Sequence, residues 1–326
     1  MAPGVRLIVT AAVHGNETCG TVALRRIIDE MSRGALRLAA GEVTFVPVTN
    51  PLAYERGQRE GDRNLNRRLL PTAEPREFED HVANWLCPLL ARHDVLLDLH
   101  SFRSPGVAFA LVGPPDNAGA LEAFTHAEQE SALAVRLGVG RLVDGWLSTY
   151  ASGIERRRAR NALRGASGPV VHADHGVGTT EYMRRMGGWA LTLECGQHED
   201  RYAPELAYQA VRRTLAHLGL VAAAEPPAAG AVESLRLFEV VDKEHADDRF
   251  SRSWTSFDPV RAGELIATRH DGTPLRAECD GFVVFPSQDA GAGQEWFYLA
   301  RSTDRFAKGS AAPAAGQTGS PPLVRT

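Results

Sequence analysis

Apolar residues follow two alternating patterns over the first two-thirds of the chain. Short, almost continuously apolar runs rich in β-branched residues occupy residues 5–13, 42–48, 95–100, 107–112 and 190–195. Between them, apolar residues recur at helical spacing over residues 21–31, 75–92, 119–137 and 204–218. Continuous apolar runs of this length are typical of strands that are covered on both faces. Strands that alternate with helices therefore predict an α/β fold, with a mixed sheet flanked by helices.

The pattern changes near residue 222, where the segment AAAEPPAAGA has the composition of a linker. Short strand-like segments follow at residues 234–241, 263–268, 281–286 and 295–300. We expect an α/β domain over residues 1–221, then a linker and a small all-β domain over residues 222–302. The remaining residues, 303–326, are rich in Ala, Gly, Ser and Pro and are predicted to be a disordered tail.

The bulk composition excludes several kinds of partner. The net charge of −4 gives no electrostatic reason to expect nucleic acid. No run approaches the ~18 apolar residues of a membrane span, and the N-terminal apolar run predicts a first strand rather than a signal peptide. The four cysteines (Cys19, Cys87, Cys195 and Cys279) are far apart, as in a cytoplasmic protein with unpaired thiols. The sequence leaves open whether the chain forms a homo-oligomer.

The first chemical signal is the motif His14-Gly15-Asn16-Glu17, which directly follows a predicted strand. A catalytic zinc ion keeps three protein ligands, typically imidazoles and carboxylates, and an open position. His14 and Glu17 can reach one ion if the chain turns sharply, and Gly15-Asn16 is suited to a turn. An isolated motif of this kind is more often a loop histidine followed by a glutamate at a helix start.

Two further polar residues make a site more plausible. His100 ends the predicted strand VLLDLH, and Glu194 lies near the end of the predicted strand ALTLEC. In open α/β sheets, functional sites form in the crevice at the carboxyl ends of the strands. His14, His100 and Glu194 are therefore predicted to lie at the same edge.

An arginine-rich segment, residues 56–68, follows the strand that ends near Val48 and is predicted to leave the sheet at this edge too. Such a segment is commonly just a solvated loop. Beside a zinc site, however, an arginine can bind a substrate carboxylate with two hydrogen bonds or stabilise a developing oxyanion.

Taken in order, the motifs HGNE, NP, NLNR, DLHS and LTLECG resemble the succinylglutamate desuccinylase/aspartoacylase family of zinc carboxypeptidase-like deacylases. The resemblance extends over roughly residues 5–220. The C-terminal segments GELIAT, DGTPL and DGFVVF are similar to the lipoyl-like barrel-sandwich fold of that family. No lysine occupies the turn where a lipoyl or biotinyl group would be attached, so no prosthetic group is expected.

The resemblance implies a role for each candidate residue. His14, Glu17 and His100 would bind one zinc ion, and Glu194 would be the general base and acid. The motif Asn66-Arg67 would bind the substrate carboxylate.

The family's oxyanion arginine precedes its Asp-Leu-Asn-Arg motif by five residues, which points to Arg59. This chain departs from that motif because Asn64 stands where the family has aspartate. The departure leaves Arg56 and Arg63 as alternatives to Arg59.

Several other residues are weaker candidates. His172 and His175 are expected to border the pocket rather than to form a second metal site. His198 is equally consistent with a substrate contact and with a surface loop. Trp296 and Tyr298 are expected to pack in the β domain, with a place in the pocket wall as the alternative.

The function that this pattern favours is zinc-dependent hydrolysis of the amide bond of a small, carboxylate-bearing N-acyl amino acid or a related N-acyl amine. A metallocarboxypeptidase that acts on peptide C-termini is the alternative. A non-catalytic small-molecule-binding protein is disfavoured, because all three ligands and Glu194 are present.

Overall fold

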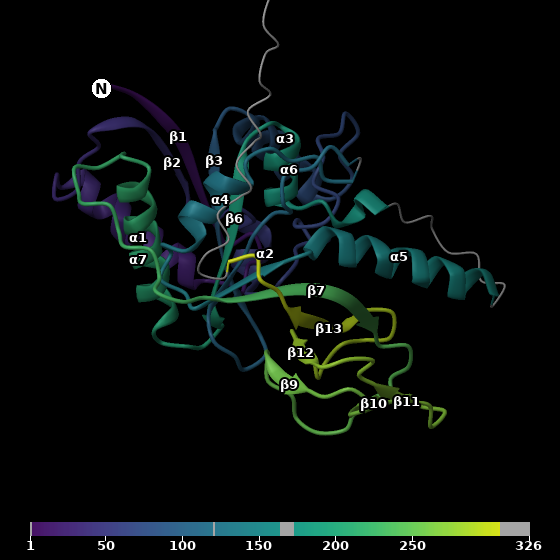
Figure 1. Cartoon of the computed structure of the whole chain (residues 1–326). Helices are drawn as coiled ribbons and strands as arrows, with labels where there is room; N and C mark the ends of the chain where they lie inside the picture. Colours follow the sequence, from purple (N-terminus) through teal and green to yellow (C-terminus); the bar gives the residue numbers. More distant parts are fainter. Residues whose placement is uncertain (1, 120, 164–172, 307–326) are drawn as a thin grey trace, which may run out of the picture.

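The computed structural model describes residues 2–119, 121–163 and 173–306, and its main feature is one mixed sheet (Figure 1). The order of this ten-stranded sheet is β2-β1-β3-β6-β4-β5-β7-β13-β12-β9, and a second sheet has the order β11-β10-β8. The predicted α/β fold with a mixed sheet is confirmed. The strands are β1 (Ala2–Ala11), β2 (Ala40–Val46), β3 (Val95–Phe102), β4 (Phe109–Leu111), β5 (Arg141–Asp144), β6 (Trp189–Gln197), β7 (Glu233–Asp242), β8 (Arg249–Phe250), β9 (Asp258–Val260), β10 (Leu265–Thr268), β11 (Pro274–Arg276), β12 (Gly281–Val284) and β13 (Glu295–Ser302).

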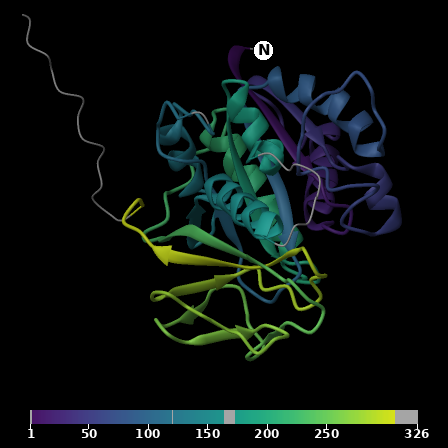
Figure 2. The same ribbon diagram turned by 90° about the vertical axis from the view of Figure 1, so that its right-hand side faces the viewer.

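Helices cover both faces of the N-terminal part of the sheet (Figures 1 and 2). Helices α1 and α7 share one buried cluster with the sheet, and α3 and α6 share another on the opposite face. The described helices are α1 (Cys19–Ser32), α2 (Pro51–Arg56), α3 (Phe78–Ala91), α4 (Ala127–Ala134), α5 (Trp146–Leu163), the short 3-10 helix η1 (Ala173–Gly176), α6 (Thr179–Arg185) and α7 (Ala203–His217). None of them is long and apolar enough to cross a membrane.

The two buried faces explain why the strand sequences are almost continuously apolar. Leu7 and Val9 of β1 pack in the cluster with α1 and α7, whereas Ile8 packs in the cluster with α3 and α6. Successive side chains of a strand point to opposite faces, so a strand covered on both sides needs apolar residues at every position. All four cysteines are unpaired, as the sequence predicted.

The sheet continues from the α/β part into the C-terminal strands. Strand β7 pairs in parallel with β5 and antiparallel with β13, and the C-terminal strands gather at one end of the molecule (Figure 2). The predicted C-terminal β region is thus present. The predicted boundary at residue 221 and the barrel-sandwich arrangement remain predictions. Most of the predicted tail, residues 307–326, lies outside the described residues.

One helix prediction is wrong. The apolar spacing over residues 119–137 forms a helix only at Ala127–Ala134. Before it, the backbones of Asn117 and Phe124 pair with each other, which turns the chain back on itself. Strand β5 and helix α5 were not predicted. Helix α5 contains the run Arg156-Arg157-Arg158, so its apolar spacing is weak.

The irregular loop between α2 and α3 is held in place by a buried carboxylate. Glu79, at the start of α3, is fully buried. Its Oε1 accepts hydrogen bonds from Asn50 Nδ2 and the backbone N–H of Gly61, both at 2.8 Å. Its Oε2 accepts from the backbone N–H groups of Asp62 and Arg63, both at 3.1 Å. A chain segment without regular structure thereby obtains partners for its buried polar groups.

Asp80 anchors the same loop through Arg63. Its Oδ1 accepts from Arg63 Nη2 at 2.9 Å, and its Oδ2 accepts from the backbone N–H groups of Arg76 at 3.0 Å and Glu77 at 3.2 Å. Burial alone would raise the pKa of Asp80, but these hydrogen bonds lower it to about 2. The ionised carboxylate therefore stabilises the fold.

We predict that Asp80→Asn lowers the free energy of unfolding at neutral pH by roughly 2 kcal/mol. Because the pKa is lower in the folded than in the unfolded chain, the stabilisation is complete above about pH 5 and declines as the pH falls through the folded pKa. Urea unfolding should show the difference between variant and wild type shrinking by about half at pH 3. Asp247→Asn, whose side chain is 66% exposed, is the control. A difference independent of pH would contradict the charge-based explanation.

Candidate functional site

One turn and one strand bring the three predicted metal ligands together. His14 and Glu17 lie in the turn after β1, and His100 lies within β3. Gly15 allows this turn to pack against α2, because a Cβ on Gly15 would lie 1.9 Å from the carbonyl carbon of Ala53. All three side chains are buried, and their potential ligand atoms lie within 4.8 Å of one another. Among the described residues, this is the group that could hold a metal ion.

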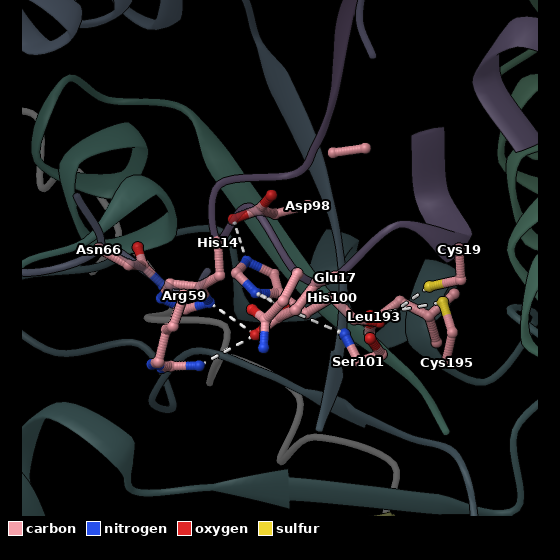
Figure 3. Close-up of polar contacts among 12 residues, drawn as sticks. His14, Glu17, Cys19, Arg59, Asn66, Asp98, His100, Ser101, Leu193 and Cys195 are labelled. Atoms are coloured by element: carbon pink, nitrogen blue, oxygen red, sulfur yellow. Dashed lines mark hydrogen bonds and ion pairs between the residues drawn. The ribbon is translucent and has the colours of Figure 1, made fainter. Parts of the chain in front are cut away.

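Glu17 is the centre of this cluster (Figure 3). Its Oε1 accepts a hydrogen bond from Arg59 Nη1 at 2.9 Å and lies 2.8 Å from His14 Nδ1. Its Oε2 accepts from His100 Nδ1 at 2.8 Å and from the backbone N–H of Ser101 at 3.1 Å. Burial alone would raise the pKa of Glu17, but the two imidazoles hold it well below its ordinary value. The site therefore contains a buried negative charge.

The outer nitrogen of each imidazole is held by a second group. Asp98 Oδ2 accepts from His100 Nε2 at 2.8 Å, and Asn64 Oδ1 accepts from His14 Nε2 at 3.1 Å. Metal-ligating histidines usually have such partners, which fix the ring orientation. Here they leave the Nδ1 atom of both rings facing Glu17. Two oriented imidazoles and a carboxylate are a ligand set that zinc prefers, so the residues fit such an ion.

Asn64 explains how the loop tolerates the departure from the family motif. Its Oδ1 accepts not only from His14 but also from the backbone N–H of Asn66, at 2.8 Å. An amide oxygen has two lone pairs and can accept both bonds, as a carboxylate oxygen would. The loop therefore faces the cluster although the negative charge of an aspartate is absent.

The three arginines that the sequence offered as alternatives for the oxyanion role lie in different surroundings. Arg59 lines the cavity beside the cluster and contacts Glu17, with its side chain 46% exposed. Arg56 donates to a backbone carbonyl of its own loop at 2.8 Å, and Arg63 is bound to Asp80. Neither of these two lines the cavity. Only Arg59 has donors near the three potential ligands.

Asn66 and Arg67 also lie at the cavity, but both already have partners. Arg67 Nη2 contacts both carboxylate oxygens of Glu295 at 3.2 Å. The hydroxyl of Tyr298 donates to Glu295 at 2.7 Å, and Asn66 Oδ1 accepts from the backbone N–H of Thr179 at 2.9 Å. The arginine predicted to bind a substrate carboxylate is thus paired with a carboxylate from the C-terminal β region.

Glu194 lies beside the cluster because its strand is next to that of His100. The two residues are in register across β6 and β3. The Glu194 Oε2 atom is buried and has no hydrogen-bond partner among the described residues. Burial raises the pKa of Glu194 to about 8. A carboxyl group with a pKa near neutrality can both accept and return a proton.

Two residues of this site, Asp98 and Glu295, were not predicted from the sequence. Asp98 had a recognisable signal, because it precedes His100 by two positions on one strand and must share its face. Its Oδ1 also accepts from Thr10 Oγ1 at 2.6 Å. Glu295 had no such signal, since it lies 228 positions from Arg67.

The histidines that were weaker candidates differ in whether they line the cavity. His198 lines the cavity, and its Nδ1 lies 2.9 Å from Ser101 Oγ. His175 stacks on Tyr150, with the ring centroids 6.5 Å apart, and does not line the cavity. His172 lies outside the described residues.

All the predicted site residues border one cavity of about 1270 Å³. Tyr298 forms part of its wall, whereas Trp296 is buried and packs against Phe250 with ring centroids 4.5 Å apart. The expected packing role therefore holds for Trp296, and the alternative of a place in the pocket wall holds for Tyr298.

The chain is similar in sequence to proteins of known family over part of its length. Residues 3–126 match the family model of the succinylglutamate desuccinylase/aspartoacylase catalytic domain. A succinylglutamate desuccinylase of Pseudomonas aeruginosa (strain LESB58) is 41% identical over 64 residues, which are 20% of this chain and 19% of that protein.

Solved structures are similar over a much larger part of the chain. The succinylglutamate desuccinylase of Vibrio cholerae superposes with a TM-score of 0.67 at 19% identity, covering 93% of this chain and 82% of that one. The product-bound ectoine utilization protein EutE (DoeB) of Ruegeria pomeroyi has a TM-score of 0.66 at 20% identity, covering 92% and 86%. These two likenesses show a shared fold. The resemblance indicated by the motifs is confirmed by the match of residues 3–126 to the model of the succinylglutamate desuccinylase/aspartoacylase catalytic domain.

Proposed function

We propose that this protein is a zinc-dependent deacylase, which hydrolyses the amide bond of a small N-acyl amino acid or a related N-acyl amine. The observation that carries this proposal is the buried group of two imidazoles and a carboxylate beside the unpartnered carboxyl group of Glu194. The match of residues 3–126 to a deacylase catalytic domain supports it. A cytoplasmic location remains a prediction from the unpaired cysteines.

His14, Glu17 and His100 would hold the zinc ion. When bound, zinc supplies Lewis-acid chemistry, which activates water at neutral pH and polarises a carbonyl oxygen. In the chain itself, Asp98 and Asn64 orient the two imidazoles for this task.

Glu194 and Arg59 would carry the catalytic roles of the chain. Glu194 takes a proton from the attacking water and returns it to the leaving nitrogen, because its carboxyl group lies beside the potential metal ligands and its Oε2 has no hydrogen-bond partner among the described residues. Arg59 lies against Glu17 and presents guanidinium N–H groups to the cavity, where they stabilise the negative charge that develops on the carbonyl oxygen.

Asn66 and Arg67 would bind the carboxylate of the substrate. A planar guanidinium group is suited to two parallel hydrogen bonds with such a group. Because Glu295 already contacts Arg67, a substrate carboxylate has to compete with it or displace it.

The metal assignment predicts about one zinc ion per chain, and a chelator should abolish activity. His100→Ala should release the metal because it removes one of three ligands. Metal analysis of both proteins after zinc supplementation tests this prediction. His198→Ala is the control, since His198 lines the same cavity outside the ligand group and should retain the metal. Absence of a stoichiometric divalent ion from the wild type would refute the zinc assignment.

The proton-transfer role predicts that Glu194→Gln retains zinc but lowers kcat by about 10²–10⁴. The change keeps the shape of the side chain and removes its ability to shuttle protons. Glu60→Gln, at an exposed residue on the cavity rim, is the control and should keep normal turnover. Near-normal turnover by Glu194→Gln would show that Glu194 has only a structural role.

The carboxylate contact predicts opposite effects for two neighbouring substitutions. Arg67→Ala should weaken substrate binding by about 2–5 kcal/mol, whereas Glu295→Gln should lower KM because it removes a competing carboxylate. Steady-state kinetics on the best substrate and on its amide analogue test both effects. The losses from Arg67→Ala and from the amide analogue should not add, because each removes one half of the same interaction.

Arg68→Ala is the control for this pair, since the Arg68 side chain is 57% exposed and does not line the cavity. Equal hydrolysis of the carboxylate and amide substrates by the wild type would contradict the assignment of Arg67.

A further inference from the structure

A wall of apolar side chains borders the same cavity on the side of the C-terminal β region. Leu111, Trp146 and Phe285 are only partly buried, and all three pack on one side against the buried cluster around Phe109 and Val284. All three also line the cavity. One side of each residue packs against the core, and the remaining surface borders the cavity that the metal ligands also line.

Three separate elements build this wall, which we call the aromatic wall and define by Leu111, Trp146 and Phe285. Leu111 ends β4, Trp146 begins α5, and Phe285 directly follows β12. The Trp146 ring lies 5.4 Å from the ring of Tyr298 and stacks on that of Tyr150 at 5.6 Å. These contacts hold the indole ring in place before any ligand arrives, which lowers the entropic cost of binding.

The backbone of Phe285 is strained in a way that maintains the wall. Its φ of 51° lies in the left-handed region, which is unfavourable for a bulky residue. The backbone N–H of Phe285 donates to Ser256 Oγ at 3.0 Å, and its ring packs against that of Phe102 at 5.9 Å. Strain of this kind persists where the surroundings impose it, and it is common at ligand sites.

The size of the cavity also suggests a larger ligand than a small N-acyl amino acid. Its volume is about 1270 Å³, above the ~300–1,000 Å³ of pockets that enclose drug-sized ligands. An acetyl or succinyl amino acid anchored at the metal ligands would leave much of this space to water. An apolar wall exposed to water is unfavourable unless a ligand covers it.

We propose that the aromatic wall is a subsite for an aromatic ring carried by the substrate, so that this deacylase prefers N-acyl amino acids with an aromatic group. The proposal rests on the proposed function, because the metal ligands anchor the amide bond in the same cavity. The wall selects by apolar contact, and it adjoins the carboxylate contact, because the guanidinium group of Arg67 lies over the Trp146 ring at 4.9 Å.

Two matched pairs of substrates test the subsite. N-acetylphenylalanine and N-acetylalanine differ by a phenyl ring on the amine side, and N-phenylacetylglycine and N-acetylglycine differ by one on the acyl side. The zinc-loaded enzyme should show a kcat/KM at least about tenfold higher for the phenyl member of one pair, as expected from burial of a ring. Phe285→Ala should remove this preference while leaving the rates on the small substrates unchanged. Trp146→Ala should also remove the preference, but it should lower the rates on the small substrates as well, because the Trp146 ring packs against Arg67.

Trp85→Ala is the control, because Trp85 is an exposed tryptophan outside the cavity. Trp146→Leu replaces Trp146→Ala if the latter does not fold, and it should reduce the preference in the same direction. A preference below about twofold in both pairs, or one that survives the Trp146 and Phe285 substitutions, would overturn the proposal.

Calorimetric binding of the same four compounds separates this proposal from the proposed function. If no compound is hydrolysed, the deacylase assignment fails, but tighter binding of a phenyl member, lost in Trp146→Ala, would still support the subsite. Equal binding within both pairs would overturn the subsite even if the enzyme hydrolyses all four compounds.

Discussion

The site depends on one buried charge, the carboxylate of Glu17. An ionised carboxylate in a protein interior is costly unless charged or hydrogen-bonding groups surround it. Here two imidazoles, a guanidinium group and a backbone N–H supply those contacts. All of these groups must therefore lie close to the Glu17 carboxylate, and the order of the strands in the sheet makes this possible. Strands β1 and β3 are adjacent and parallel, so the turn after one and the end of the other meet at the same edge.

The loop between α2 and α3 brings the arginines to this edge by a different route. It has no regular structure of its own, and the buried carboxylates of Glu79 and Asp80 hold it by its backbone and by Arg63. The C-terminal β region reaches the same cavity through Glu295 and Tyr298. The cavity is thus formed jointly by the sheet edge, an anchored loop and the C-terminal strands. All three parts contribute charged groups, and the C-terminal strands also contribute aromatic surface through Tyr298.

The local apolar pattern was sufficient to predict strands β1, β3 and β6 and the candidate ligands at their ends. The runs that contain Leu7, His100 and Glu194 form the neighbouring strands β1, β3 and β6, which are buried on both faces. Polar residues at the ends of these strands border the cavity. The apolar spacing over residues 119–137 did not give a helix over the whole segment. The backbone of Asn117 pairs with that of Phe124, and the helix forms only at Ala127–Ala134. Asp98 could have been predicted as a partner of His100, because residues two positions apart on a strand lie on the same face.

The sequence by itself determined the α/β fold and the candidate metal ligands, because periodicity and motif spacing are local properties of the chain. Only the tertiary structure decided what the loop arginines contact. Arg59 came to lie on Glu17, Arg63 on Asp80, and Arg67 on Glu295. The last partner, Glu295, is 228 positions away, and it lies on β13, which joins the sheet through its pairing with β7 and the pairing of β7 with β5. Contacts at such separations depend on how whole elements pack, and no local pattern in the sequence records them.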